Sequence, residues 1–451
     1  MKISIITVFP EFYQEFIKTS LVARAVENKI VEFNFIKFSD LTSAGQRIDE
    51  PVCGPGAGMI IKPEVLQKSI ESCVQEHGDG YKIFFSPQGK KLEQPLLKLL
   101  ANKLYFCAQE EKIKKTLSVK NTHLILICAR YEGIDERVQD YYADLVMSIG
   151  DYVLMGGDLP AQVFLEGFLR LIPGVVGKQE SIEEESFSGS FLDYPEYGLP
   201  VEWKDKNIPE VVRSGNHAQI EKWRKEQAAK KTICRRFDWF ISSQPSKQDI
   251  EIAKQFVPNH YVALMHNQIL VQDGREGNSS ITSLDIHDIA RSAATYGIKN
   301  YFVVSSLQDQ HKILNTFLNF WHSKEGKDYN QSRFDAVKAI LPAFSLNEAI
   351  EAIKEKEGLD PIIIATSAKQ HGFEDKIIDY FSQGRLFALQ RPVLILFGTA
   401  QGLSDQVLDR CDYLLLPLDG LTDYNHLSVR SAAAIVLDRW LGLKPKVMVE
   451  K

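Results

Sequence analysis

The sequence has no close pair of cysteines and no long apolar run. Its six cysteines are scattered, and no two of them form a C-x-x-C pair: Cys53, Cys73, Cys107, Cys128, Cys234 and Cys411. This argues against a structural zinc site or a disulfide framework, and it fits a reducing compartment. No apolar stretch is long enough to span a bilayer, and the strand-like start before Pro10 is too short for a secretion signal. We therefore expect a cytoplasmic protein with no membrane segment and no protein-bound metal site.

Neither sign of charge dominates. The formal net charge is only −6, so any binding of nucleic acid must come from local patches. G-x-G-x-x-G and Walker sequences are also missing, which counts against a nucleotide-binding regulator of the α/β class. With 451 residues, 44% of them hydrophobic and 25% charged, the chain has the composition of a soluble globular protein with two or three domains.

One stretch carries the strongest pattern. Leu124 to Cys128 is a continuous apolar run, typical of a strand buried on both faces, and a polar turn follows from Ala129 to Asp135. A second apolar run starts at Leu145 and leads into a turn with three glycines. Open α/β sheets bind ligands at such strand ends, because backbone without side chains allows close approach.

The same pattern returns downstream. Val393 to Gly402 and Asp412 to Leu418 repeat the two runs, and a short strand precedes each copy, at Lys82 to Lys90 and at Pro361 to Gln370. This ordered match predicts two related α/β units. A coincidence of common α/β patterns is the alternative explanation.

Between these units the composition changes twice. Residues 178–193 are polar, acidic and glycine-containing, which indicates a flexible connector. From Lys222 to Arg236, seven residues are Lys or Arg and one is Glu, with Trp223 among them. This run is either a solvated helix face or a contact with an RNA backbone. The predicted organisation has a first α/β domain, the connector, a helical subdomain, a linker and a second α/β domain: 1–177, 178–193, 194–243, 244–258 and 259–451.

Residues 1–240 contain seven short motifs, each once: FPE (9–11), GxGM (56–59), SPQG (86–89), RYEGIDERV (130–138), SIGDYVLxGG (148–157), RxIPGV (170–175) and SGNHAxIxxWR (214–224). In this set the chain resembles the bacterial tRNA (guanine-N1)-methyltransferases, which methylate the guanosine next to the anticodon. The resemblance implies an α/β fold of the SPOUT class, with a parallel sheet and a C-terminal trefoil knot. It also implies S-adenosylmethionine as methyl donor, tRNA as partner and a homodimer, and it leaves room for a Mg²⁺ ion.

The resemblance assigns residues to the donor site. An adenosine needs apolar walls and a few backbone donors and acceptors. Without the family, the glycines would be ordinary turn residues and the two tyrosines ordinary core aromatics. The matching positions are Pro87, Ala129, Tyr131, Glu132, Ile149, Gly150, Tyr152, Leu154, Gly156 and Gly157.

The chemistry of the reaction asks for two further groups. Guanine N1 carries a proton that a base must remove, and negative charge then grows on O6. Glu185 occupies the position of the family's aspartate, and Arg170 matches its arginine for the transfer step; without the family they would be a solvated carboxylate and a helix-capping cation. Two departures weaken the match, because Ala129 replaces a glycine and PEYGLP (195–200) lacks a histidine and an arginine of the family.

The C-terminal unit resembles a second group of SPOUT-type RNA methyltransferases, through LDIHDIARSAATYG (284–297), LFGTAQGL (396–403) and DYNHLSVRSAAAI (423–435). The resemblance implies that Arg291 is catalytic, although the family's asparagine is replaced near it. It places the donor beside Gly398, Leu416, Leu427 and Ser428. The alternative is a non-catalytic module that binds RNA or dimerises.

Overall fold

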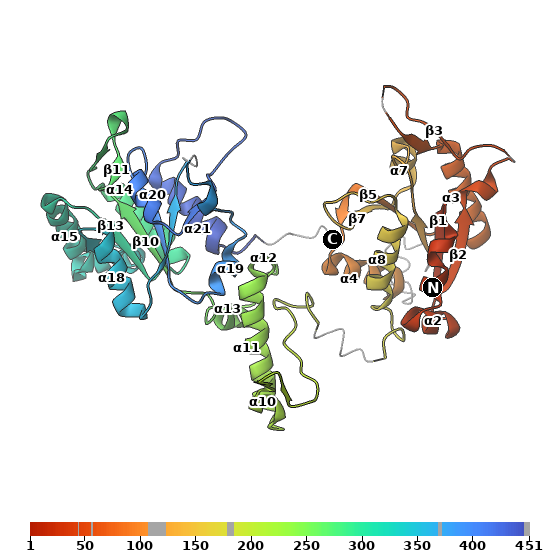
Figure 1. Cartoon of the computed structure of the whole chain (residues 1–451), viewed down its shortest axis with the longest axis horizontal. Helices are drawn as coiled ribbons and strands as arrows, with labels where there is room; N and C mark the ends of the chain where they lie inside the picture. The colour runs from red at the N-terminus through yellow and green to blue at the C-terminus, as the bar shows by residue number, and fades with distance from the viewer. Residues whose placement is uncertain (44, 56, 107–122, 178–184, 369–371, 446–451) are drawn as a thin grey trace. The chain divides into compact units, whose positions relative to one another are not determined.

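A computed structural model describes residues 1–43, 45–55, 57–106, 123–177, 185–368 and 372–445. The chain forms two compact units, Met1–Ser188 (unit 1) and Gly189–Lys451 (unit 2), each built on a parallel β-sheet (Figure 1). This confirms the prediction of an α/β protein with two sheet-containing units.

Unit 1 has a five-stranded sheet in which every neighbouring pair is parallel. The spatial order is β2-β1-β6-β5-β7, with β1 Lys2–Thr7, β2 Glu32–Lys37, β5 Tyr81–Lys91, β6 His123–Ile127 and β7 Leu145–Ser148. A small hairpin, β3 Asp49–Pro51 and β4 Met59–Ile61, stands apart from this sheet.

Helices cover both faces of the unit 1 sheet, because alternate strand residues point to opposite sides. In β6, Leu124 and Leu126 pack into one core cluster, whereas Ile125 and Ile127 pack into another. All four are fully buried, as the apolar run predicted. The helices are α1 Gln14–Ile17, α2 Ser20–Glu27, α3 Pro63–His77, α4 Gln94–Ala101, α7 Glu136–Tyr142 and α8 Asp158–Leu169.

Unit 2 has a short hairpin, β8 Glu202–Trp203 and β9 Lys206–Asn207, near its start. Four helices follow: α10 Glu210–Arg213, α11 His217–Arg235, α12 Phe237–Ser242 and α13 Lys247–Ala253. Ile233, Phe237 and Phe240 belong to the same core cluster as the strands of the following domain. The helical subdomain is therefore part of unit 2, and α13 lies within the stretch predicted as a linker. This division differs from the predicted boundary, which rested on composition. The predicted connector falls partly outside the described residues, at 178–184.

A seven-stranded parallel sheet forms the centre of unit 2. Its order is β14-β13-β10-β17-β15-β18-β16, with β10 His260–Met265, β13 Asn300–Val304, β14 Ile340–Ala343, β15 Ile362–Thr366, β16 Ile377–Ile378, β17 Val393–Gly398 and β18 Tyr413–Leu415. Its helices are α14 Ser283–Thr295, α15 Gln308–His322, α16 Lys324–Tyr329, α17 Gln331–Val337, α18 Leu346–Glu357, α19 Gln383–Phe387, α20 Asp405–Arg410 and α21 Val429–Leu441.

The two sheets share an arrangement of four strands. Unit 1 places β1, β6, β5 and β7 side by side, and unit 2 places β10, β17, β15 and β18 in the same order. In both units the strand that comes first in the sequence motif, β5 or β15, lies between the two that follow it. The predicted repeat of three elements therefore corresponds to a repeated arrangement in space.

No helix in the described part of the chain combines the length and the apolar character that a membrane span requires.

Candidate functional site

Unit 1 contains a cavity of about 380 Å³ where the carboxyl ends of β5, β6 and β7 meet. Its volume lies within the range of roughly 300–1,000 Å³ that small-molecule sites occupy. The structure brings all ten residues predicted for the donor site to this one cavity: Pro87, Ala129, Tyr131, Glu132, Ile149, Gly150, Tyr152, Leu154, Gly156 and Gly157.

Glycines permit close packing of the two loops that wall the cavity. The Gly157 N–H donates to the Ala129 carbonyl at 2.8 Å, which joins the loop after β6 to the loop after β7. A Cβ on Gly156 would lie 2.8 Å from that same carbonyl oxygen and 2.6 Å from Arg130 Cδ, so a larger residue would force the loops apart. Ala129 is itself buried in the core beside β6, so its methyl group is accommodated where the family has glycine.

The chain around Gly58 and Met59 packs against Glu132, a residue of the cavity wall. The Glu132 N–H donates to the Met59 carbonyl at 2.9 Å, and the Glu132 side chain covers Gly58, where an added Cβ would lie 2.3 Å from Glu132 Cγ. The preceding residue, Tyr131, has a φ of 62° and an exposed ring that borders the cavity. Glu132 is thus one of two carboxylates on the wall of this cavity, together with Glu136.

Asp158 contacts these loops from the buried start of α8. It is the first residue of α8 and fully buried, and its carboxylate accepts hydrogen bonds from Thr7 Oγ1 at 2.5 Å, Arg130 Nε at 3.1 Å and Tyr13 OH at 3.3 Å. Burial raises the pKa of Asp158, although these three partners act in the opposite direction. Because Arg130 lies between the β6 loop and Gly156, this ion pair ties the cavity wall to the start of α8.

The predicted base and arginine lie together but away from this cavity. Arg170 Nη2 and Glu185 Oε2 are 2.5 Å apart, and Gln94 Nε2 donates to Glu185 Oε1 at 3.1 Å. Neither Glu185 nor Arg170 lines the cavity. Arg170 caps the C-terminus of α8, whereas Gly157 and Pro160, at its N-terminus, do line it. Twelve helical residues separate these ends by about 18 Å.

In unit 2, two of the predicted donor residues lie at the carboxyl ends of the strands that flank β15. Gly398 ends β17, and Leu416 follows β18, on the other side of β15. A Cβ on Gly398 would lie 2.6 Å from the Leu403 nitrogen, so the turn requires glycine. Leu427 is exposed, and Ser428 caps α21 by accepting from the Ser431 N–H. Arg291 lies on the exposed side of α14, a helix that packs against α21.

Comparison with known proteins gives two family matches. Residues 1–242, more than half of the chain, match the model described as "tRNA (Guanine-1)-methyltransferase TrmD". Residues 259–442 match the model described as "SAM-dependent RNA methyltransferase". The chain belongs to the tRNA (guanine-1)-methyltransferase family. Its C-terminal part is a domain of the second family.

Individual relatives fall into two length classes. A tRNA (guanine-N(1)-)-methyltransferase of Oleidesulfovibrio alaskensis is 35% identical over 448 residues, which cover 98% of this chain and 99% of the relative. A protein of the same name from Nitratidesulfovibrio vulgaris matches to the same extent. That of Thermotoga maritima is 40% identical over 250 residues, 55% of this chain and 94% of the relative. Members of this methyltransferase family thus occur at both lengths.

Sequence reasoning missed an ion pair beside the predicted arginine of unit 2. Asp285, in the first turn of α14, accepts a hydrogen bond from Arg430 Nη1 at 3.2 Å, and Asp288 Oδ2 lies 3.8 Å from Arg430 Nε. This pair joins α14 to the start of α21, so it links the helix of Arg291 to that of Ser428. The spacing of acidic residues in LDIHDIAR was the only available signal, and it did not identify the partner.

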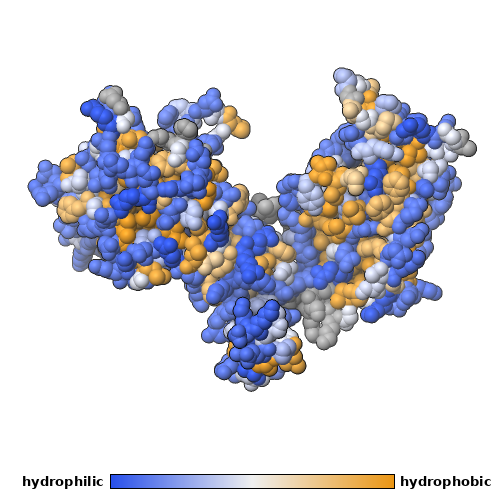
Figure 2. Space-filling model, viewed as in Figure 1, coloured by the Kyte–Doolittle hydropathy of each residue, from blue (hydrophilic) through white to orange (hydrophobic). Residues whose placement is uncertain are grey.

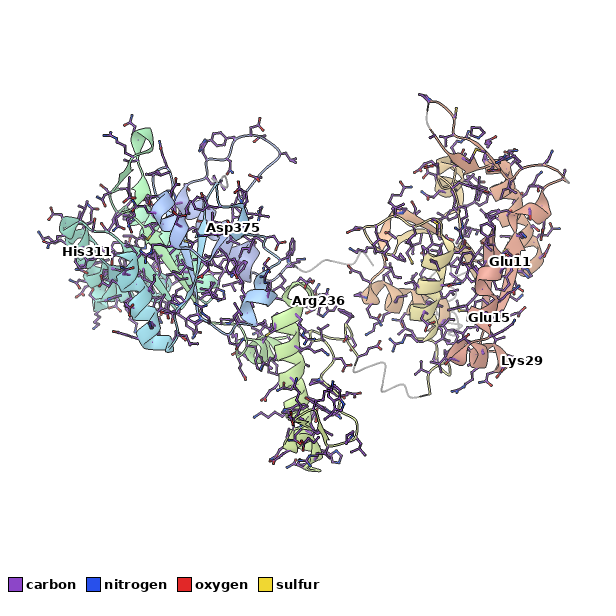
Figure 3. The ribbon with its side chains drawn as sticks, viewed as in Figure 1. Glu11, Glu15, Lys29, Arg236, His311 and Asp375 are labelled. Carbon is purple, nitrogen blue, oxygen red and sulfur yellow. The ribbon has the colours of Figure 1, made fainter. Side chains whose placement is uncertain are left out.

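The basic run on α11 is largely engaged within unit 2. Lys225 pairs with Asp249 at 3.5 Å, Lys231 donates to the Asp193 carbonyl at 2.9 Å, and Arg236 pairs with Asp238 at 3.0 Å (Figure 3 labels Arg236). The Arg224 guanidinium stacks on Tyr194. Lys230 and Arg235 are exposed, and a contact of this run with RNA stays a prediction.

Within the described residues, no three His, Cys, Asp or Glu side chains are arranged to hold a metal ion.

Proposed function

We propose that unit 1 transfers a methyl group to N1 of the guanine next to the anticodon of tRNA. The observation that carries this proposal is the convergence of the ten residues predicted for the donor site on one cavity, in a member of the tRNA (guanine-1)-methyltransferase family. When bound, S-adenosylmethionine supplies the methyl group from its sulfonium centre. The finer fold that we propose is the SPOUT class with a trefoil knot, supported by the position of β5 between β6 and β7.

The residues of the cavity fit such a donor. The closely packed backbone at Gly156 and Gly157 offers polar groups to an adenosine, and Ile149, Tyr152 and Leu154 offer apolar surface. Methyl transfer to tRNA carrying guanine or adenine at the acceptor position, followed by nucleoside analysis, tests the reaction. We expect 1-methylguanosine from the first tRNA alone. Equal labelling of both would contradict the proposal.

Glu185 serves as the base in our proposal, and it acts on the cavity of a second copy of the chain. Its carboxylate accepts the N1 proton as the methyl group arrives, and Arg170, its ion-pair partner, stabilises the charge that develops on O6. The distance along α8 separates this pair from the cavity of its own subunit. A homodimer brings the two halves of the site together.

An apolar surface supports the dimer. Leu159 and Val163 are four residues apart on one face of α8, Met155 lies in the loop that leads into this helix, and all three are exposed. Figure 2 shows apolar surface over the face of unit 1 on which α8 lies in Figure 1. A contiguous exposed apolar surface is typical of a protein interface. A second copy of unit 1 is the occupant that we propose for it.

For unit 2 we propose a second methyl transfer to RNA, with the donor beside Gly398, Leu416, Leu427 and Ser428 and with Arg291 as a catalytic residue. The shared strand order and the match to an RNA methyltransferase family support this proposal. The second candidate is a module that binds RNA without catalysis. It is favoured by the replacement of the asparagine and by the pairing of Asp285 with Arg430 in that region.

A further inference from the structure

Unit 2 has a cavity of about 510 Å³ that none of the predicted site residues lines. It lies at the carboxyl ends of β10, β13 and β14: Asn267 follows β10 by two residues, Ser306 follows β13 by two, and Phe344 follows β14 directly. Sheet order reverses at β10, since the chain continues to β13 on one side and later returns to β17 on the other. Ligands of open α/β sheets bind at such points.

The polar groups of this amide cavity, as we call it, are mainly carboxamides. Asn267, Gln268, Asn278 and Asn347 line it, with one acid, Glu276, and one base, Arg410. Arg410 Nη2 already donates to Asn347 Oδ1 at 2.5 Å. Carboxamides offer donors and acceptors together, whereas a phosphate site needs an excess of cations or free N–H donors. The cavity therefore suits a neutral group with both donors and acceptors on its edge.

Asn267 has an unused acceptor. The residue is 7% exposed, and its Nδ2 makes one long hydrogen bond to the Phe344 carbonyl at 3.4 Å. Within the described part of the chain, Asn267 Oδ1 has no hydrogen-bond partner, and the same is true of the adjacent His266 Nε2. A buried polar atom without a partner is destabilising, so a ligand that donates a hydrogen bond to Asn267 Oδ1 removes this cost.

Phe344 supplies a flat apolar wall. Its ring is 48% exposed, and it stacks on the His311 imidazole with 3.8 Å between ring centroids and an interplanar angle of 16°. His311, labelled in Figure 3, is buried and is fixed by its Nε2–H, which donates to the Ser305 carbonyl at 2.7 Å. The phenyl ring is thus held in place from behind. Nucleobases stack on aromatic rings that are exposed and fixed in this way.

The amide cavity shares a wall with the predicted donor loop. The Ser404 N–H donates to the Gln268 carbonyl at 3.0 Å, and the Leu270 N–H donates to the Gly402 carbonyl at 2.8 Å. Gln268 lines the cavity, while Gly402 belongs to the turn that follows Gly398. A group in the cavity therefore lies next to the loop on which we place the methyl donor.

We propose that the amide cavity binds a single unpaired base of an RNA substrate, as the acceptor site of unit 2. The base stacks on Phe344, and its edge donates to Asn267 Oδ1. This inference rests on the methyl transfer proposed for unit 2, and it names the part of the substrate that the domain reads.

Calorimetric titration of the full chain with adenosine, guanosine, cytidine and uridine tests the proposal, in saturating S-adenosylhomocysteine so that donor sites are filled. We expect at least one nucleoside to bind, with an affinity lowered about tenfold by Asn267→Leu and by Phe344→Ala. Phe344→Ala removes an exposed ring, so it should fold normally. It tests the site even if Asn267→Leu misfolds. Asn315→Ala, which removes an exposed carboxamide from α15, should leave affinity unchanged.

The outcomes separate this inference from the function proposed for unit 2. If no nucleoside binds at millimolar concentration, or if Phe344→Ala binds as well as the unaltered chain, the amide cavity is not a base site. If nucleosides fail this test but two molecules of S-adenosylhomocysteine bind per chain, the donor site proposed for unit 2 is still supported. Nucleoside binding that depends on Phe344, with one equivalent of S-adenosylhomocysteine, would support the base site and overturn the second methyl transfer.

Discussion

Asp158 and Arg130 form a buried ion pair in unit 1, with 3.1 Å between the carboxylate and Nε and with side chains only 1% and 15% exposed. Arg130 lines the unit 1 cavity, which we call the donor cavity because we propose that it binds the methyl donor. The Arg130 guanidinium also stacks over Phe9 and Phe12. Buried ion pairs lose stability sharply when one partner is removed, because the other charge stays buried without compensation.

Asp158→Asn should therefore destabilise unit 1 by about 3 kcal/mol and weaken donor binding, since Arg130 and the loops around Gly156 lose their anchor. Urea unfolding and calorimetry with S-adenosylhomocysteine measure the two effects. The matched control is Glu15→Gln, whose partner Lys18 lies 3.6 Å away in an exposed pair, and it should change stability by less than about 1 kcal/mol. Equal effects from both variants would show that burial does not set the strength of the Asp158 pair.

Glu185→Gln should lower methyl transfer at least about a hundredfold while donor binding survives, because a general base is lost and the cavity is untouched. Glu132→Gln is the comparison, since Glu132 lines the cavity of its own chain. Single-turnover assays with tRNA give both rates. A near-normal rate for Glu185→Gln with a collapse for Glu132→Gln would move the base to Glu132.

Mixed dimers should reveal sharing of the site between subunits. A chain with Arg170→Ala and a chain with Gly156→Trp are each expected to be inactive alone. In a mixed dimer, one of the two sites combines an intact cavity with an intact Glu185–Arg170 pair, so activity should return to about half per mixed dimer. Absence of rescue under proven subunit exchange would place the whole site within one chain.

Gly89→Ala should damage the sheet next to the donor cavity. A Cβ at Gly89 would lie 2.5 Å from the backbone nitrogen of Met147, so β5 and β7 would have to separate. We expect a loss of about 1–3 kcal/mol and weaker donor binding, because Pro87 and Met147 line the cavity. Gly177→Ala, where no atom lies within 4 Å of the added Cβ, should be neutral in both measurements. Equal stability of the two variants would show that β5 and β7 do not pack as closely at Gly89 as the structure indicates.

Acidification should destabilise unit 2 between about pH 6.5 and pH 4. Burial lowers the pKa of His260 and of His266 from 6.5 to about 4, so in this range the unfolded chain binds protons that the folded chain does not. Stability is therefore complete above pH 6.5 and falls as the pH decreases, by up to about 3 kcal/mol per histidine. Hydrogen exchange of β10 at several pH values measures the slope.

His260→Phe removes one of these two titrating groups. The free energy of unfolding of unit 2 should then change less steeply with pH, by up to about 1.4 kcal/mol per pH unit. The variant also deprives Trp440 Nε1 of its acceptor, which lies 3.0 Å away, and its stability should be lower at neutral pH. His217→Gln, at an exposed position on α11, is the control and should keep the original slope. If the pH dependence of stability is the same in His260→Phe as in the unaltered chain, His260 is not one of the groups that cause it.

The sequence determined the local features of this protein. The loops after β6 and β7 that wall the unit 1 cavity each follow an apolar strand, and parallel strands end at the same edge. Order along the chain therefore indicated a site at this edge, while the resemblance to the family supplied its residues. The repeat of strands in unit 2 was visible for the same reason, as was the burial of Leu124 to Ile127 on both faces.

Tertiary structure decided what depends on residues far apart in the sequence. Composition placed a linker at 244–258, but Ile233 and Phe237 are packed into the core of unit 2, and the compact units divide after Ser188. Motif order could not show that Glu185 and the donor cavity lie at opposite ends of α8, nor that Asp158 would meet Thr7 across 151 positions. Charge pairing and burial depend on which elements the fold brings into contact, and a side chain carries no local signal of its distant partner.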